Sequence, residues 1–286
     1  MTQPNLQITP IAGTELASWE WNPRAKGQAP TLLFAHATGF HGRAYDAIIE
    51  HFPDRHVLSL DVHGHGCSGG DLVEHWVDII AETRAWLEHL GVKSAHGIGH
   101  SMGGHILVQL AADTPDMFSK LTLFDPVIVD PEWYVSGELS FSPDAPHPAI
   151  KRKRDFASAG AMFERFKDRD PYALFEPRVL RDYCEYGLLE KADGDGMELA
   201  CSPEMEASFY GSSRSNGGII EASARVDIPV TVVRALRTTF SDFKSSPTWP
   251  GLADHLPQGT DVYRPDMTHF HPFQDPADAA RIIAES

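Results

Sequence analysis

The sequence predicts an α/β fold with a mostly parallel central sheet and helices on both faces. Over the first 130 residues, short apolar segments alternate with longer segments of helical periodicity, which is typical of parallel sheets. The alternation stops between residues 131 and 223 and returns near the C-terminus. We therefore expect a core formed by residues 1–130 and 224–286, and an inserted helical cap formed by residues 131–223.

The elements of the predicted core follow from their apolar spacing. The expected strands are an opening hairpin around Gly13 formed by 6–12 and 16–21, and then 31–36, 56–62, 95–100, 120–126, 229–236 and 261–264. Helices are expected at 44–52, 76–90 and 101–113. Ser246-Pro247 predicts a helix N-cap followed by proline at the first helical position, and Asp275-Pro276 predicts the start of the final helix.

The predicted cap is rich in aromatic and charged residues at helical spacing. Two apolar faces are expected, one formed by Met162, Phe163 and Phe166, the other by Val179, Leu180, Tyr183, Cys184 and Gly187. As a group, the aromatic residues imply an apolar chamber. The basic run 151–154 predicts a solvated helix face rather than an anion site.

Composition restricts the classes of partner. The 24 basic and 40 acidic residues give a net charge of −16, which repels the phosphates of nucleic acids. Cys67, Cys184 and Cys201 lie far apart, so neither a disulfide framework nor a zinc knuckle is expected. The N-terminal residues show no secretory signal, and no apolar run approaches the ~18 residues that span a bilayer. We expect a cytoplasmic protein with a small-molecule substrate and no membrane partner. Whether the chain forms a homodimer is left open by the sequence.

A Gly-x-Ser-x-Gly segment, Gly99-His100-Ser101-Met102-Gly103, lies between a predicted strand and a predicted helix. A sharp strand-to-helix turn holds its central residue in a strained conformation and leaves no room for side chains two positions away. Glycine fits both positions. The context predicts Ser101 as a nucleophile at the tip of the turn.

A serine hydroxyl needs a base to act as a nucleophile at neutral pH. His269, just after the last predicted strand, is the expected base, and His271 is the alternative. The negative oxygen formed during acyl transfer needs backbone N–H donors, which we expect from Met102 and Thr38. His63 and His65 alternate with glycines in a predicted turn without an evident third ligand, so no metal site is expected.

Together these segments resemble the capped α/β-hydrolases. The elbow at 99–103, the loop His36-Ala37-Thr38-Gly39-Phe40, the segment 61–68 and Thr268-His269-Phe270 occur in the order of that family. The resemblance covers nearly the whole chain and implies a serine nucleophile, a histidine and an acid. It differs at position 63, where this chain has histidine and the family usually has arginine.

Two aspartates are candidates for the acid that would orient the histidine. In most similar hydrolases it follows the strand after the cap, but here the segment 234–239 contains no carboxylate, and Asp242 comes a few residues late. Asp125 ends the preceding strand, where haloalkane dehalogenase relatives carry the acid. We predict Asp125, with Asp242 as the alternative.

The expected function is a serine hydrolase that cleaves carboxylic esters of small apolar substrates through an acyl-enzyme on Ser101, without a cofactor. The serine at position 101 argues against dehalogenase and epoxide hydrolase activities of the related kind, which use an aspartate nucleophile. A carbon–carbon bond hydrolase, a thioesterase or a lyase on the same residues stays open. A small-molecule binding protein or sensor without turnover is the alternative of a different class.

Overall fold

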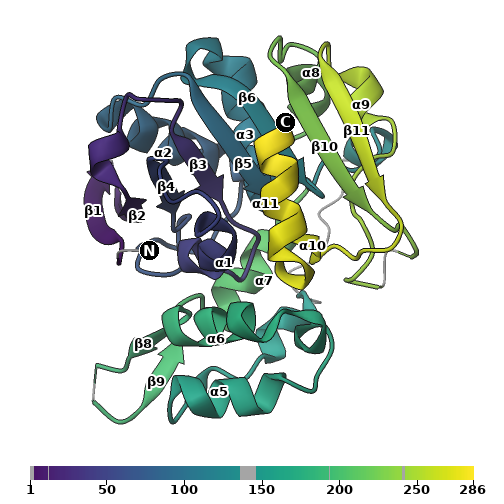
Figure 1. The fold of residues 1–286 in the computed structure, drawn as a ribbon. Coiled ribbons are helices and arrows are strands. Elements are labelled where there is room, and N and C mark those ends of the chain that lie inside the picture. The colour runs from purple at the N-terminus through teal and green to yellow at the C-terminus, as the bar shows by residue number, and fades with distance from the viewer. Residues whose placement is uncertain (1–2, 12, 136–145, 193, 240–241) are drawn as a thin grey trace.

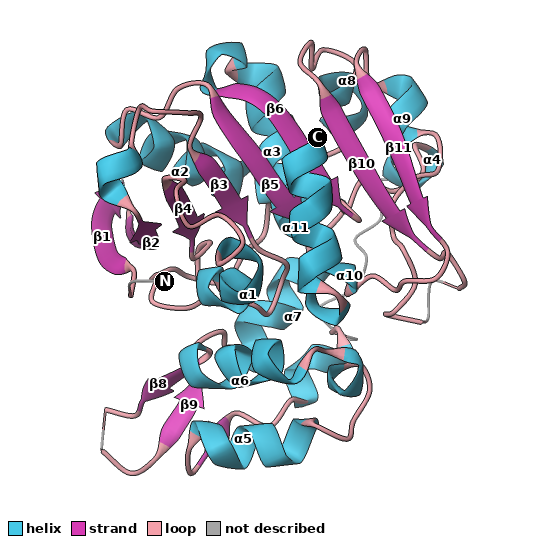
Figure 2. Ribbon diagram, viewed as in Figure 1, coloured by secondary structure: helices cyan, strands magenta, loops and turns pink. Residues whose placement is uncertain are grey.

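The fold is built on an eight-stranded sheet, seen in the computed structural model of the chain (Figures 1 and 2). The structure describes all residues except 1–2, 12, 136–145, 193 and 240–241. The sheet order is β1-β2-β4-β3-β5-β6-β10-β11. Its strands are β1 (Asn5–Ile11), β2 (Thr14–Trp21), β3 (Leu32–Ala35), β4 (Val57–Leu60), β5 (Ala95–His100), β6 (Phe118–Phe124), β10 (Val230–Ala235) and β11 (Gly259–Arg264).

Strand direction brings distant parts of the sequence to one edge of this sheet. The strands from β4 to β11 run parallel, whereas β2 is antiparallel to β1 and β4. Every residue of β3, β4 and β5 is buried, as expected for parallel strands covered on both faces. The segments that follow β3, β5, β6, β10 and β11 therefore meet at the carboxyl edge, where open α/β sheets bind ligands.

Helices cover both faces of the sheet. In Figure 1, α1 and α11 lie in front of the sheet, and α2, α3 and α8 lie behind it. Each face has its own apolar cluster, because the buried side chains of α2 and α3 belong to one and those of α1 and α11 to the other. The helices of the core are α1 (Asp46–Ile49), α2 (Trp76–His89), α3 (Met102–Asp113), α8 (Ile219–Ser223), α9 (Leu252–His255), α10 (His271–Gln274) and α11 (Pro276–Glu285).

The segment inserted between β6 and β10, residues 131–223, is called the cap segment below. Figure 1 shows α5 and α6 beyond the carboxyl edge of the sheet, with α7 at the junction. The residues of α6 that face inward, Val179, Leu180, Tyr183 and Cys184, share an apolar cluster with α1 and α11. Its regular elements are α4 (Glu132–Val135), the 3-10 helix η4 (Pro148–Lys151), β7 (Asp155–Phe156), α5 (Ala159–Phe166), the 3-10 helix η5 (Tyr172–Leu174), α6 (Pro177–Tyr186), β8 (Leu188–Glu190), β9 (Met197–Leu199) and α7 (Pro203–Gly211).

Three local predictions are wrong. No helix begins at Ser246-Pro247, because the Ser246 hydroxyl donates to Asp125 instead of capping a helix, and α9 begins only at Leu252. The helix expected at 44–52 is shorter, with a 3-10 turn at Gly42–Tyr45 before α1. The run 151–154 is not a solvated helix face, because η4 ends at Lys151 and the Arg152 side chain turns inward to Glu206.

The remaining expected strands and helices agree with the structure to within about two residues at most ends, the usual scatter of element boundaries. Among the residues described, no helix is long and apolar enough to cross a membrane.

Candidate active site

Ser101 lies at the sharp turn between β5 and α3. Its φ of 56° and ψ of −116° are a conformation that residues other than glycine rarely adopt. A Cβ on Gly99 would lie 2.6 Å from the Cα of Gly104, and a Cβ on Gly103 would lie 2.0 Å from the carbonyl oxygen of Ala35. Both glycines are therefore required by close backbone approach, and the turn presents Ser101 at the carboxyl edge of the sheet.

His269 is the histidine that the fold brings to this serine. Its Nε2 lies 3.1 Å from Ser101 Oγ. Its backbone N–H donates to the carbonyl of Lys244 at 2.8 Å, so the loop after β10 helps to hold it. His271, the alternative base, turns away to the final helix, where its Nε2 lies 2.8 Å from Asp278 Oδ2.

Asp125 lies on the opposite side of the His269 ring. Its Oδ2 is 3.4 Å from His269 Nδ1, slightly longer than a hydrogen bond, and neither atom has another partner among the described residues. Catalytic contacts of this kind are often long before substrate binds. The other oxygen, Oδ1, accepts from the backbone N–H of Ala235 at 3.0 Å and from the Ser246 hydroxyl at 2.5 Å. These bonds aim Oδ2 at the imidazole.

Asp242, the alternative acid, is bound within its own loop. Its carboxylate accepts from the backbone N–H of Lys244 at 3.0 Å and from the Thr238 hydroxyl at 3.1 Å. This is the turn-stabilising arrangement common for aspartate in loops. The structure therefore brings Asp125, and not Asp242, together with His269.

The two predicted oxyanion donors lie on either side of the turn. Met102 is the first residue of α3, and the Thr38 hydroxyl lies 3.5 Å from its Sδ. Within the described part of the chain, no acceptor is found for the backbone N–H of Thr38 or Met102. The next N–H in the loop, that of Gly39, donates to His65 Nε2 at 3.0 Å. Among the described residues, the N–H groups of Thr38 and Met102 therefore keep the capacity to donate to a further acceptor.

Sequence reasoning missed two residues that support this arrangement, His100 and Tyr45. Burial lowers the pKa of His100 well below its ordinary value, so the ring is neutral. Its Nε2–H donates to the carbonyl of His269 at 2.8 Å, and its Nδ1 accepts from the Tyr45 hydroxyl at 2.8 Å. Tyr45 in turn accepts from the N–H of Ala37 at 3.3 Å. This chain of bonds joins the backbone of His269 to the loop that contains Ala37 and Thr38.

The sequence signal for His100 was its position directly before Ser101. Ser246 holds Asp125, whereas its position before Pro247 predicts a helix cap. No local signal pointed to Tyr45, because its contacts depend on how β3 and β5 pair.

His63 and His65 are engaged in other contacts. His63 Nδ1 lies 2.8 Å from Glu82 Oε2, and its Nε2 donates to the carbonyl of Asp71. His65 Nδ1–H donates to the carbonyl of His63 at 2.8 Å. In the ranges that the structure describes, no cluster of three histidine, cysteine, aspartate or glutamate residues is arranged to hold a metal ion.

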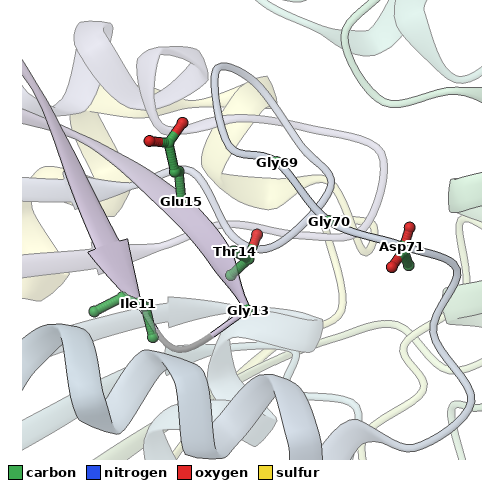
Figure 3. Close-up of a pocket in the computed structure, with 7 residues that line it drawn as sticks. All are labelled: Ile11, Gly13, Thr14, Glu15, Gly69, Gly70 and Asp71. Atoms are coloured by element: carbon green, nitrogen blue, oxygen red, sulfur yellow. The ribbon is translucent and has the colours of Figure 1, made fainter.

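An open depression elsewhere on the surface does not belong to this site. It lies between the β1–β2 turn and residues 69–71 (Figure 3). Its described lining residues include no serine or histidine, and the side chains of Glu15 and Asp71 lie apart in the view of Figure 3. Four strand spacings separate β1 from β5, about 19 Å at about 4.8 Å each.

Known proteins share this fold and parts of this sequence. A segment of 106 residues, 36% of the chain, is 34% identical to the dihydrolipoyllysine-residue acetyltransferase component of the acetoin cleaving system of Cupriavidus necator, of which it covers 28%. A segment of 99 residues, 34% of the chain, is 31% identical to the lipase LipV of Mycobacterium tuberculosis, of which it covers 37%. The chain thus spans about a third of the length of these curated relatives.

The crystal structure of E-2-(acetamidomethylene)succinate hydrolase is similar with a TM-score of 0.73, covering 99% of this chain and 98% of that one. At 20% identity this likeness concerns the fold alone. A family model described as the alpha/beta hydrolase fold matches residues 30–217. With the serine turn, the sheet order and this match in agreement, the chain belongs to the alpha/beta hydrolase fold family.

Proposed function

We propose that the protein is a serine hydrolase that cleaves carboxylic esters, with Ser101 as nucleophile, His269 as base and Asp125 as the acid that orients the histidine. The observation that carries the proposal is the contact of 3.1 Å between Ser101 Oγ and His269 Nε2, with Asp125 Oδ2 at 3.4 Å from the other ring nitrogen. This is the geometry of nucleophile, base and orienting acid.

In the proposed reaction, Ser101 Oγ attacks the ester carbonyl carbon while His269 Nε2 takes the hydroxyl proton. Asp125 keeps the proton of the imidazole on Nδ1, so that Nε2 is free to accept, and stabilises the imidazolium that forms. The negative oxygen of the tetrahedral intermediate accepts from the N–H groups of Met102 and Thr38. The alcohol leaves with the proton from His269, and water then cleaves the acyl-enzyme by the same route.

The acyl or alcohol group of the substrate would lie against an aromatic wall. The Phe40 ring centre lies 6.0 Å from that of Phe175 and 6.3 Å from that of Phe270, which follows the proposed base directly. Phe175 belongs to the cap segment, whereas Phe40 and Phe270 belong to core loops. This wall supports a substrate with an apolar part of modest size.

The test is active-site labelling combined with hydrolysis of p-nitrophenyl esters of short fatty acids. A fluorophosphonate should add once to the native protein, as seen by intact mass, and not to Ser101→Ala. Ester turnover by that variant should fall by about 10⁶-fold, the loss that removal of a serine nucleophile causes elsewhere.

Ser213→Ala serves as the control, because that hydroxyl donates to the carbonyl of Tyr210 within the cap segment, and it should behave as the native protein. An adduct that persists in Ser101→Ala contradicts the assignment of the nucleophile. A native protein that gains no adduct and cleaves no ester would instead support the binding-protein alternative.

A further inference from the structure

The basic run 151–154 places one of its arginines inside the protein. The Arg152 side chain keeps 18% of its exposure, compared with 41% for Arg154 two residues later. Arg154 pairs with Glu204 at the surface, whereas Arg152 pairs with the buried Glu206 of α7. The two arginines therefore differ in environment although they are neighbours in the sequence.

The Arg152 guanidinium also donates hydrogen bonds to the hydroxyl groups of two tyrosines. Its Nη2 donates to the Tyr183 hydroxyl at 2.8 Å and to the Tyr172 hydroxyl at 3.2 Å. Burial opposes the charge, but the two phenols and Glu206 outweigh it and raise the pKa of Arg152 well above its ordinary value, so the group stays a cation. Burial raises the pKa of Glu206, an effect that Arg152 opposes.

This cluster is rich in donors. A phenol oxygen that accepts from a guanidinium still carries its own hydrogen, and the guanidinium has further N–H groups. Among the described residues, Glu206 is the one carboxylate that accepts from Arg152. A ligand that satisfies the cluster must therefore bring acceptor oxygens, and a planar guanidinium matches a carboxylate best through paired hydrogen bonds.

The cluster borders the proposed active site on two sides. A Cβ built on Gly39 would lie 2.9 Å from Cδ and Oε1 of Glu206, and Gly39 directly follows the oxyanion donor Thr38. The Tyr183 ring centre lies 5.0 Å from that of Phe40 in the aromatic wall. α7, which carries Glu206, lies at the junction of the core and the cap segment (Figure 1).

We propose that Arg152, with Tyr172 and Tyr183, binds a carboxylate carried by the substrate at the end remote from the scissile ester. In the structure the Glu206 carboxylate holds that position on the guanidinium, and the substrate carboxylate takes its place. The adjoining cavity, lined in part by Gly39, Arg152 and Tyr183, has a volume of about 10 Å³, the space of about one water molecule. A substrate carboxylate that replaces the Glu206 carboxylate needs little added volume, so it fits this space better than a larger anion does. The inference rests on the proposed function and narrows its substrates to half-esters of dicarboxylic acids.

The test compares two substrates that share an acyl chain and a leaving group and differ in charge, mono-p-nitrophenyl glutarate and its methyl ester. The native protein should favour the acid in kcat/KM. Arg152→Gln should lose about 10- to 100-fold on the acid, the range expected for charge-assisted hydrogen bonds, mainly through KM. It should lose little on the methyl ester. Glu206→Gln removes the competing carboxylate and should increase the preference for the acid.

Arg154→Gln is the matched control, because it removes a positive charge from the same run at an exposed position, and it should leave the ratio of the two substrates unchanged. A native protein without preference, or an Arg152→Gln variant that loses both substrates equally, overturns the inference and leaves Arg152 as a structural tie within the cap segment. If neither substrate is cleaved and no fluorophosphonate adduct forms, the proposed function itself fails.

A measurement on the native protein covers the case in which Arg152→Gln does not fold. Free glutarate should slow fluorophosphonate labelling of Ser101, whereas its uncharged diamide should not. Equal protection by both compounds, or by neither, contradicts the inference.

Discussion

The core and the cap segment stabilise their polar groups in different ways. Of the 15 histidines, only His147 belongs to residues 131–223, whereas 7 of the 16 arginines do. Burial lowers the pKa of several core histidines, which stay neutral, whereas arginines of the cap segment pair with carboxylates, as core arginines such as Arg43 also do. Buried neutral imidazoles are therefore concentrated in the core.

In the core, several buried histidines bind backbone groups near the candidate site. His36 Nε2 accepts from the N–H of Val62, and His65 Nε2 accepts from that of Gly39. His100 and His105 donate to the carbonyls of His269 and Val127. Since these bonds fix loops at the strand ends, they hold the groups that would perform the chemistry in one arrangement.

In the cap segment, the arginines bind side chains. Arg152 pairs with Glu206, and Arg178 pairs with Glu50 of the core and with Asp182. A pair of side chains can exchange partners without moving the backbone. The comparison supports the two proposals above, that core residues carry out the reaction and that Arg152 of the cap segment selects substrates.

Among the variants that test this comparison, the largest expected effect is on the kcat of a variant in the core. Asp125→Asn should lower kcat by about 10⁴-fold for every substrate alike, because an amide beside Nδ1 favours the wrong tautomer of His269. Steady-state kinetics on the glutarate pair measures both the loss and its independence of substrate.

Asp242→Asn is the control for this prediction, since Asp242 is bound within its own loop, and it should keep kcat within about threefold of native. The reverse result would make Asp242 the acid and would require the loop after β10 to rearrange.

Glycine-to-alanine substitutions compare how closely the backbone is packed in the core and in the cap segment. Gly103→Ala should destabilise the protein by more than about 4 kcal/mol, because the added Cβ would lie 2.0 Å from the Ala35 carbonyl oxygen. Gly160→Ala, in α5 of the cap segment, meets only Ser158 Oγ at 3.7 Å and should stabilise by about 0.5–1 kcal/mol. Denaturant unfolding of the two variants gives both values, and a stable Gly103→Ala would show that the elbow can relax.

A further expected effect is on the pH dependence of stability. Burial lowers the pKa of His41, His65 and His105 to about 4 and that of His96 to about 3. As the pH falls below about 6.5, these histidines become protonated in the unfolded chain but stay neutral in the folded protein. The free energy of unfolding therefore decreases, on the order of 1–2 kcal/mol per histidine at pH 5.

Asp46 and Asp61, whose pKa burial raises to about 6, act in the opposite direction, but they are fewer. Thermal unfolding between pH 7.5 and 4.5 should show Tm falling, and His65→Gln, which keeps an acceptor for Gly39, should show a shallower fall. A Tm that stays level as the pH falls would refute the view that these histidines stay neutral in the folded core.

Local patterns in the sequence determined the features that depend on neighbouring residues. Gly99 and Gly103 around Ser101 predicted the turn, because its steric demands fall within five residues. The same holds for the apolar periodicity of α2 and α3 and for the N-cap at Asp275, whose side chain accepts from the N–H of Asp278.

Only the tertiary structure decided the contacts between distant segments. The sequence leaves Asp125 and Asp242 open as acids, and the proximity of Asp125 to His269 follows from the place of β6 between β5 and β10. The local sequence predicts Ser246 as a cap and Arg152 as solvated, but each side chain bonds to a partner more than 50 residues away. Periodicity reports which face of an element is apolar, whereas the partner of a polar side chain depends on how the elements pack.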